Sequence, residues 1–197
     1  MTPAEVIVKF TEKSRLGTII NESRDRPLGE NRALLDGVAD LSEALSTPLI
    51  AKSITSGSEL VLGVNVTAVL ADLRKKLEGY PGVSKVRKIP SDQKPILPQI
   101  SEEVAVGFLP DTEESKTLAQ ARTCQNPADC IEPVVANLAE KTGYPLKGRL
   151  LRGRRLAVGI DLGATIQNLV ERLKKNSDVE YAQPNFILGP MSSGMAE

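Results

Sequence analysis

The chain has 197 residues, and its 25 basic and 25 acidic side chains give a formal net charge of zero. It contains no histidine and no tryptophan, and only three tyrosines and three phenylalanines. This composition excludes histidine-dependent catalysis and histidine metal sites, and it gives no electrostatic or base-stacking argument for binding nucleic acid or a membrane.

The first half of the chain predicts four strands and two helices. Val6, Val8 and Phe10 alternate with Ile7 and Lys9, which is the period of a half-buried strand. The other elements follow from apolar residues at helical or alternating spacing, bounded by Gly and Pro. In chain order we expect a strand over 6–10, a loop over 11–31, a helix over 34–45, strands over 49–54 and 60–66, a helix over 68–77 and a strand over 83–89.

The second half predicts the same order of elements. Gly143 is expected to end its first helix, and residues 152–154 form the turn of a hairpin. The expected elements are a strand over 104–108, a polar stretch with both cysteines, a helix over 129–141, strands over 146–151 and 155–162, a helix over 166–173 and a strand over 179–187.

The two halves are also copies of one another in sequence. Residues 60–83 and 156–179 align without a gap at an offset of 96, and residues 5–10 match 103–108. A repeat of this length is too long for a solenoid unit, so we expect each copy to be a domain. The predicted boundaries are a first domain at 1–90, a proline-rich linker at 91–102, a second domain at 103–191 and a flexible C-terminal tail at 192–197.

The order βαββαβ predicts an α+β fold of two tandem ferredoxin-like domains, each with two helices on one face of a four-stranded antiparallel sheet. Pro184 fits the fourth strand, which lies at a sheet edge in this topology. In the second copy, the strand residues expected to face the helices are Leu156, Val158, Ile160 and Leu162. The outer face is then expected to carry Ala105, Gly107, Ala157, Gly159 and Asp161. Most of these residues are small, so another protein could approach the face closely.

The only two cysteines are Cys124 and Cys130. They are either a small disulfide loop in a secreted protein or a pair of unbonded thiols. Two cysteines without a histidine cannot complete a four-ligand zinc site, so no metal is expected. The start of the chain has no apolar, signal-like core. We expect an extracellular protein whose export signal has been removed.

Three segments of the second copy carry a family resemblance: the strand over 156–160, the helix after it, and residues 178–186, which read Asp-Val-Glu-Tyr-Ala-Gln-Pro-Asn-Phe. In these segments the chain resembles the propeptides of subtilisin-like serine proteases, the peptidase inhibitor I9 family. The first copy keeps the same frame. It has Ser-Lys-Val-Arg-Lys-Ile at 84–89 in place of that ending, so its resemblance is weaker.

The resemblance implies that the sheet docks on two helices of the protease and that the tail enters the active-site cleft as a substrate-like strand. Gln183 and Asn185 stand where the family commonly carries acids that cap those helices. We therefore expect weaker capping, and tighter binding when both become acidic. The resemblance assigns four tail residues to protease subsites: Leu188, Gly189, Pro190 and Met191. Met191 is expected in the primary specificity pocket.

The predicted partner is a subtilisin-like serine protease, and the chain is either a free-standing inhibitor or an excised proregion that assists folding. The first domain then supports the second or adds a contact surface. Two other functions stay open, a ferredoxin-like ligand-binding module and an assembly module, neither of which contacts a protease. An enzyme is the least favoured class, and no cofactor is expected. The basic hairpin over 149–155 is either solvated or contacts an acidic partner.

Overall fold

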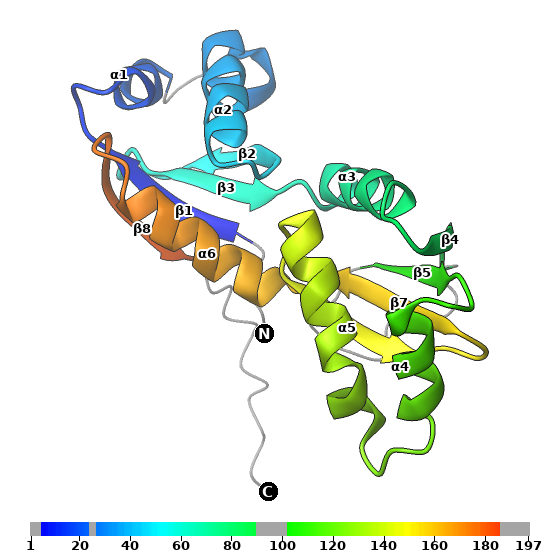
Figure 1. The fold of residues 1–197 in the computed structure, drawn as a ribbon. Helices are drawn as coiled ribbons and strands as arrows, with labels where there is room; N and C mark the ends of the chain where they lie inside the picture. Colours follow the sequence, from blue (N-terminus) through cyan, green and yellow to red (C-terminus); the bar gives the residue numbers. More distant parts are fainter. Residues whose placement is uncertain (1–4, 24–26, 90–101, 186–197) are drawn as a thin grey trace, which may run out of the picture. The chain divides into compact units, whose positions relative to one another are not determined.

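The computed structural model describes residues 5–23, 27–89 and 102–185. Within them the chain forms a mixed α+β fold with two four-stranded antiparallel sheets and six α-helices (Figure 1). In chain order the elements are β1 Glu5–Phe10, α1 Arg15–Glu22, the 3-10 helix η1 Leu28–Glu30, α2 Arg32–Ala44, β2 Leu49–Ile54, β3 Leu60–Val64, α3 Val66–Glu78, β4 Val83–Lys88, β5 Glu103–Phe108, α4 Glu113–Ala121, α5 Pro127–Thr142, β6 Leu146–Leu150, β7 Arg155–Ile160, α6 Leu162–Lys174 and β8 Val179–Pro184.

The two sheets have the strand orders β2-β3-β1-β8 and β4-β5-β7-β6. Each sheet therefore takes three strands from one copy of the repeat and its fourth, edge strand from the other copy. The compact units follow the sheets: unit 1 combines the residues before Asn65 with those after Thr165, and unit 2 is Asn65–Thr165. Pro184 lies on an edge strand as predicted.

This exchange corrects the predicted boundaries at 1–90 and 103–191. The helix–strand pair α3–β4 completes unit 2, and the pair α6–β8 completes unit 1. The sequence repeat is real, but the sequence alone does not say which copy a terminal helix–strand pair joins, because the apolar pattern of both copies is the same.

Unit 1 has its core on one face of its sheet. Val6, Val8 and Phe10 of β1 are buried, while Glu5, Ile7 and Lys9 between them are half-buried on the other face. This alternation is the one predicted for β1. The helices meet the buried face with apolar residues at helical spacing, among them Leu34, Val38 and Leu41 of α2 and Ile166, Leu169 and Leu173 of α6.

Unit 2 repeats this arrangement. Leu156, Val158 and Ile160 of β7 are at most 1% exposed, as expected for residues that face the helices. The prediction is wrong for Leu162, because β7 ends at Ile160 and Leu162 begins α6. The helical side of this core includes Leu73 and Leu77 of α3, Leu118 of α4 and Ile131, Val135 and Leu138 of α5. Gly143 ends α5 with a positive φ of 75°, the left-handed conformation that favours glycine.

Side-chain contacts between α3 and the end of α5 explain why α3 belongs to unit 2. The Tyr144 hydroxyl donates to Asp72 Oδ2 at 2.7 Å, and Lys76 Nζ donates to the Thr142 carbonyl at 2.9 Å. The Lys76 ammonium also lies 4.5 Å from the centroid of the Tyr144 ring. The first copy has Thr47 at the equivalent position, two residues before its second strand. A sequential arrangement would therefore deprive Asp72 and Lys76 of this aromatic partner.

Two short helices lie where the sequence predicted loops. Helix α1 lies within 11–31 and α4 lies ahead of the cysteines. Each begins at a side-chain cap: Ser14 Oγ accepts from the N–H of Gly17 at 3.0 Å, and Thr112 Oγ1 accepts from the N–H of Ser115 at 3.2 Å. Each helix buries only three residues, so its periodic signal is too short to predict a helix.

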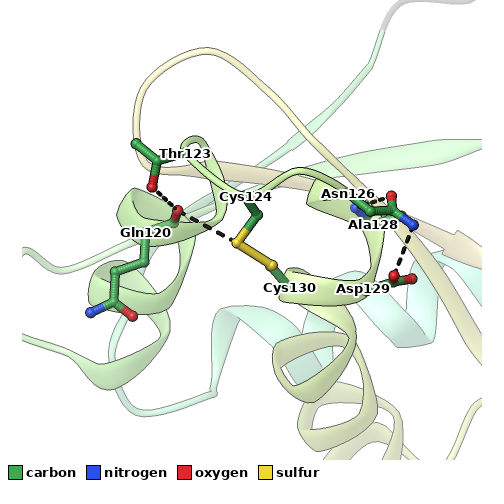
Figure 2. Close-up of a disulfide and its surroundings, with 7 residues drawn as sticks. All are labelled: Gln120, Thr123, Cys124, Asn126, Ala128, Asp129 and Cys130. Atoms are coloured by element: carbon green, nitrogen blue, oxygen red, sulfur yellow. Dashed lines mark hydrogen bonds between the residues drawn. A yellow bond between two sulfur atoms is a disulfide. The ribbon is translucent and has the colours of Figure 1, made fainter.

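A disulfide joins Cys124, just after α4, to Cys130 in the first turns of α5 (Figure 2). This is one of the two alternatives that the sequence left open. Between them Asn126 caps α5, its Oδ1 accepting from the N–H of Ala128 at 3.3 Å, and Pro127 occupies the first helical position. The disulfide thus holds together the short connection between α4 and α5.

Candidate docking surface

The outer face of the unit 1 sheet is the surface that β8 completes. Ile7 of β1 lies opposite Val61 of β3 on one side and Gln183 of β8 on the other. Because Val6 and Val8 face the core, Ile7 and its two neighbours face away from it. Val61 lies on this outer face beside Ile7, and yet it is only 6% exposed. The centre of this face is therefore apolar.

Three side chains follow one edge of this apolar centre: Tyr181 and Gln183 of β8, and Asn185 directly after it. Tyr181 lies opposite Lys9, and Gln183 is exposed. Asn185 is tied to the first strand, because its backbone N–H donates to the Glu5 carbonyl and its Nδ2 donates to Glu5 Oε2, each at 2.9 Å. The amide of Asn185 is thus half-buried and faces a carboxylate of its own chain.

A hydrogen-bonded group fixes the other end of this edge. The hydroxyl of Tyr181 donates to Glu59 Oε1, and Thr55 Oγ1 donates to Glu59 Oε2 at 2.6 Å. These bonds, that of Thr55 first, and the nearby charge of Lys9 lower the pKa of Glu59. The residue Tyr181 stays 36% exposed. An oriented, exposed tyrosine is a residue well suited to a protein interface.

The predicted docking residues do not share one sheet. Gln183 and Asn185 belong to unit 1, whereas Ala105, Gly107, Ala157, Gly159 and Asp161 belong to unit 2. The reason is the exchange of the terminal helix–strand pairs. The prediction assumed that β8 pairs with β5, but β8 pairs with β1.

An ion pair covers two of the five residues. Glu103 lies opposite Gly159, and Arg149 lies opposite Ala157, on the strands that flank β7. Arg149 Nε donates to Glu103 Oε1 at 2.9 Å and Arg149 Nη2 donates to Glu103 Oε2 at 2.6 Å, so the pair crosses β7. Ala157 is 0% exposed as a result. The expectation of an open surface is therefore wrong at Ala157 and Gly159.

Asp161 has a structural role in the fold. Its Oδ1 accepts from the N–H of Ala164 at 3.1 Å in the first turn of α6, and its Oδ2 forms an ion pair with Lys147 Nζ at 3.0 Å. Its side chain is only 16% exposed. The remaining two residues, Ala105 and Gly107, are half-buried and border a hollow in the sheet face.

The tail residues Leu188, Gly189, Pro190 and Met191 lie outside the described residues, as do 90–101 and 192–197. In the sequence, β8 precedes this tail and ends at Pro184. Among the residues that are described, no group of three or more His, Cys, Asp or Glu side chains could hold a metal ion. In the same parts of the chain, no helix has the length and apolar character needed to cross a bilayer.

Sequence reasoning missed the apolar centre at Ile7 and Val61. A usable signal was present, because β3 reads Leu-Val-Leu-Gly-Val without alternation. An unbroken apolar run predicts a strand with apolar residues on both faces of its sheet. Comparison of the chain with protein-family models, with curated proteins and with solved structures gave no match.

Proposed function

We propose that this chain is a secreted inhibitor or folding chaperone of a subtilisin-like serine protease, built from two ferredoxin-like units. Its docking surface is the outer face of the unit 1 sheet, and its C-terminal tail enters the active-site cleft. The disulfide between Cys124 and Cys130 supports secretion. The strand order of each sheet, with the last strand of the βαββαβ set at an edge beside the first, supports the ferredoxin-like assignment.

The observation that carries the proposal is the continuity between the docking face and the tail. Gln183 and Asn185 flank the apolar centre formed by Ile7 and Val61, and the chain continues from this edge into the residues that resemble a protease-binding tail. Beside this centre Tyr181 and Gln183 are exposed, and an exposed aromatic side chain next to polar groups is typical of a protein-binding surface. A tail that leaves an edge strand can add to a strand of the protease through main-chain hydrogen bonds.

The first experiment measures steady-state inhibition of a panel of subtilisin-type proteases by the full chain and by a chain truncated after Ile187. We expect inhibition by the full chain and at least a hundredfold loss on truncation, because the substrate-like contacts disappear. If neither form inhibits any protease and both are cut rapidly, the chain is instead a ligand-binding or assembly module.

A pair of matched variants tests the docking face. Ile7→Glu places a charge at the centre of the unit 1 face, and Ala105→Glu places the same charge at the equivalent position of unit 2. An unpaired charge buried in an interface costs several kcal/mol. We expect Ile7→Glu to weaken inhibition at least tenfold and Ala105→Glu to leave it unchanged, with circular dichroism confirming that both fold. Equal effects, or an effect of Ala105→Glu alone, would move the docking face elsewhere.

A further inference from the structure

A hollow of about 390 Å³ lies on the outer face of the unit 2 sheet. Its floor is Ala105 and Gly107 of β5. Arg87 of β4 lies opposite Ala105, and Arg155 of β7 lies opposite Gly107, so a basic residue stands on each side of the floor. The four basic side chains that line the hollow are Lys85, Arg87, Arg154 and Arg155.

In the parts of the chain that the structure describes, no ion pair neutralises the positive charge of this hollow. Within the described residues none of its four basic side chains forms an ion pair, and no acidic side chain lines it. The rest of the same face differs, because Glu103 is paired with Arg149 and Asp161 with Lys147. The described residues of this face thus gather four basic side chains without an ion pair at one place, in a chain whose formal net charge is zero.

The floor of the hollow leaves the backbone of the sheet open to a ligand. A Cβ atom at Gly107 would lie 3.2 Å from Ser84 Oγ and 3.9 Å from Arg155 Cγ, so any side chain there would enter the space between the walls. Ala105 adds only a methyl group. The hollow therefore has basic walls, a small-residue floor and a volume within the range of small-ligand sites.

The chemistry of the walls selects the ligand. A guanidinium group presents a planar fork of donors that matches two phosphate oxygens, and a lysine adds a point charge. Like charges gathered in one hollow repel one another, and a ligand with several negative charges relieves that repulsion. Because the cations stand on both sides of β5, a ligand with at least two anionic groups can contact both walls.

We propose that this hollow binds a small ligand that carries two or more phosphate groups, with Arg87 and Arg155 as its main contacts. The hollow belongs to unit 2, whereas the proposed protease-docking face belongs to unit 1. The phosphate site is therefore independent of the proposed inhibitory function, and either one can fail without the other.

The test is isothermal titration calorimetry of the full chain with inorganic tripolyphosphate. We expect saturable binding at one site that weakens as salt rises. Arg87→Gln and Arg155→Gln should each weaken binding about tenfold or more, the usual size of a lost charge-assisted hydrogen bond. Ala105→Leu should also weaken it by filling the hollow without a change of charge. The control Lys75→Gln removes one exposed charge from α3 and should leave binding unchanged.

Three further ligands complete the test. Tighter binding of a nucleoside triphosphate than of tripolyphosphate identifies a nucleotide as the source of the phosphates, and equal binding identifies the phosphates alone. Inorganic monophosphate should bind at least tenfold more weakly than either. A glutamate-rich peptide that binds as tightly as tripolyphosphate would overturn the proposal in favour of an acidic protein partner. Absence of tripolyphosphate binding, or an equal loss in Lys75→Gln, would overturn it as well.

Discussion

Ile7 lies directly opposite Gln183, which pairs β1 with β8, the first and last of the described strands. The repeat equivalents of these two residues, Ala105 and Arg87, also lie opposite one another. The register of the edge pairing is therefore the same in both sheets, although each edge strand comes from the other copy. Each unit keeps the pairing geometry of a single copy and differs only in which copy supplies the terminal helix–strand pair.

The exchange can be tested by cross-linking. Facing residues of an antiparallel pair have Cα atoms about 4.5–5.5 Å apart, a separation that a disulfide bridges. We expect Ile7→Cys with Gln183→Cys to form an intramolecular disulfide on mild oxidation, read by mass spectrometry of the digested chain. The control pair, Ala105→Cys with Gln183→Cys, should stay reduced. Cross-linking of the control pair alone would show that β8 pairs with β5 and that the units are sequential.

The same exchange predicts which fragments fold. A fragment over 65–165 contains every helix and strand of unit 2 and begins at Asn65, whose side chain caps α3. We expect it to unfold cooperatively in urea. A fragment over 1–90 lacks β8 and carries α3 without its α5 partner, so it should not show a cooperative transition. The opposite result would restore the sequential domain boundaries.

Two leucines at the same position of the repeat allow the stability of each unit to be changed separately. Leu73 of α3 is 0% exposed and Leu169 of α6 is 2% exposed, and each occupies the same position of the repeat. Replacement of either by alanine should cost about 2–5 kcal/mol. Because of the exchange, Leu73→Ala should speed hydrogen exchange in β5 and β7, and Leu169→Ala should speed it in β1 and β3. Faster exchange of β1 in Leu73→Ala would contradict the assignment of α3 to unit 2.

The contacts of Tyr144 with Asp72 predict that the stability of unit 2 depends on pH. The hydrogen bond from Lys76 first, and then that from Tyr144, lowers the pKa of Asp72. A carboxyl with a lowered pKa stabilises the fold above its unfolded pKa of about 3.9, and this stability is lost as the pH falls through the lower value. The effect is modest because the Asp72 side chain is 40% exposed.

Urea unfolding of the 65–165 fragment between pH 7 and pH 2 measures this effect. Tyr144→Phe keeps the ring and removes the hydrogen bond, so it should lower stability at pH 7 and reduce the loss of stability on acidification. Asp72→Asn should abolish the part of the acid-induced loss of stability that comes from this carboxyl. If both variants lose as much stability on acidification as the unmodified fragment, the contact is absent in solution.

The sequence predicts most of this architecture and misplaces part of the candidate site, for one physical reason. Apolar periodicity specifies that Leu73 and Leu169 face a core, because the period of a helix is a local property. It does not specify which core, since both copies offer the same apolar surface. That choice depends on contacts such as Tyr144 with Asp72, which join residues far apart in the chain and leave no periodic trace. The same ambiguity divided the predicted docking residues between two sheets.

The two amide side chains at the end of the described chain, Gln183 in β8 and Asn185 directly after it, lead to different expectations for protease binding. If each stands near the N-terminus of a protease helix, an acid there gains about 0.3–1 kcal/mol, which is a factor of about 2 to 5 in affinity. Gln183 is exposed, so Gln183→Glu should tighten inhibition by this factor. Asn185 donates to Glu5 at 2.9 Å, so Asn185→Asp would set two carboxylates against each other and lose the bond. We therefore expect Asn185→Asp alone to give no gain.

The double variant Glu5→Gln with Asn185→Asp separates these two effects. It reverses the hydrogen bond, because the new amide can donate to the new carboxylate, and it removes the repulsion. The inhibition constant should then improve by the same factor as in Gln183→Glu, with Glu5→Gln alone as the control that shows no gain. If Gln183→Glu weakens inhibition while the protein remains folded, β8 does not lie beside the protease helices. The inhibitory contact would then have to come from the tail alone.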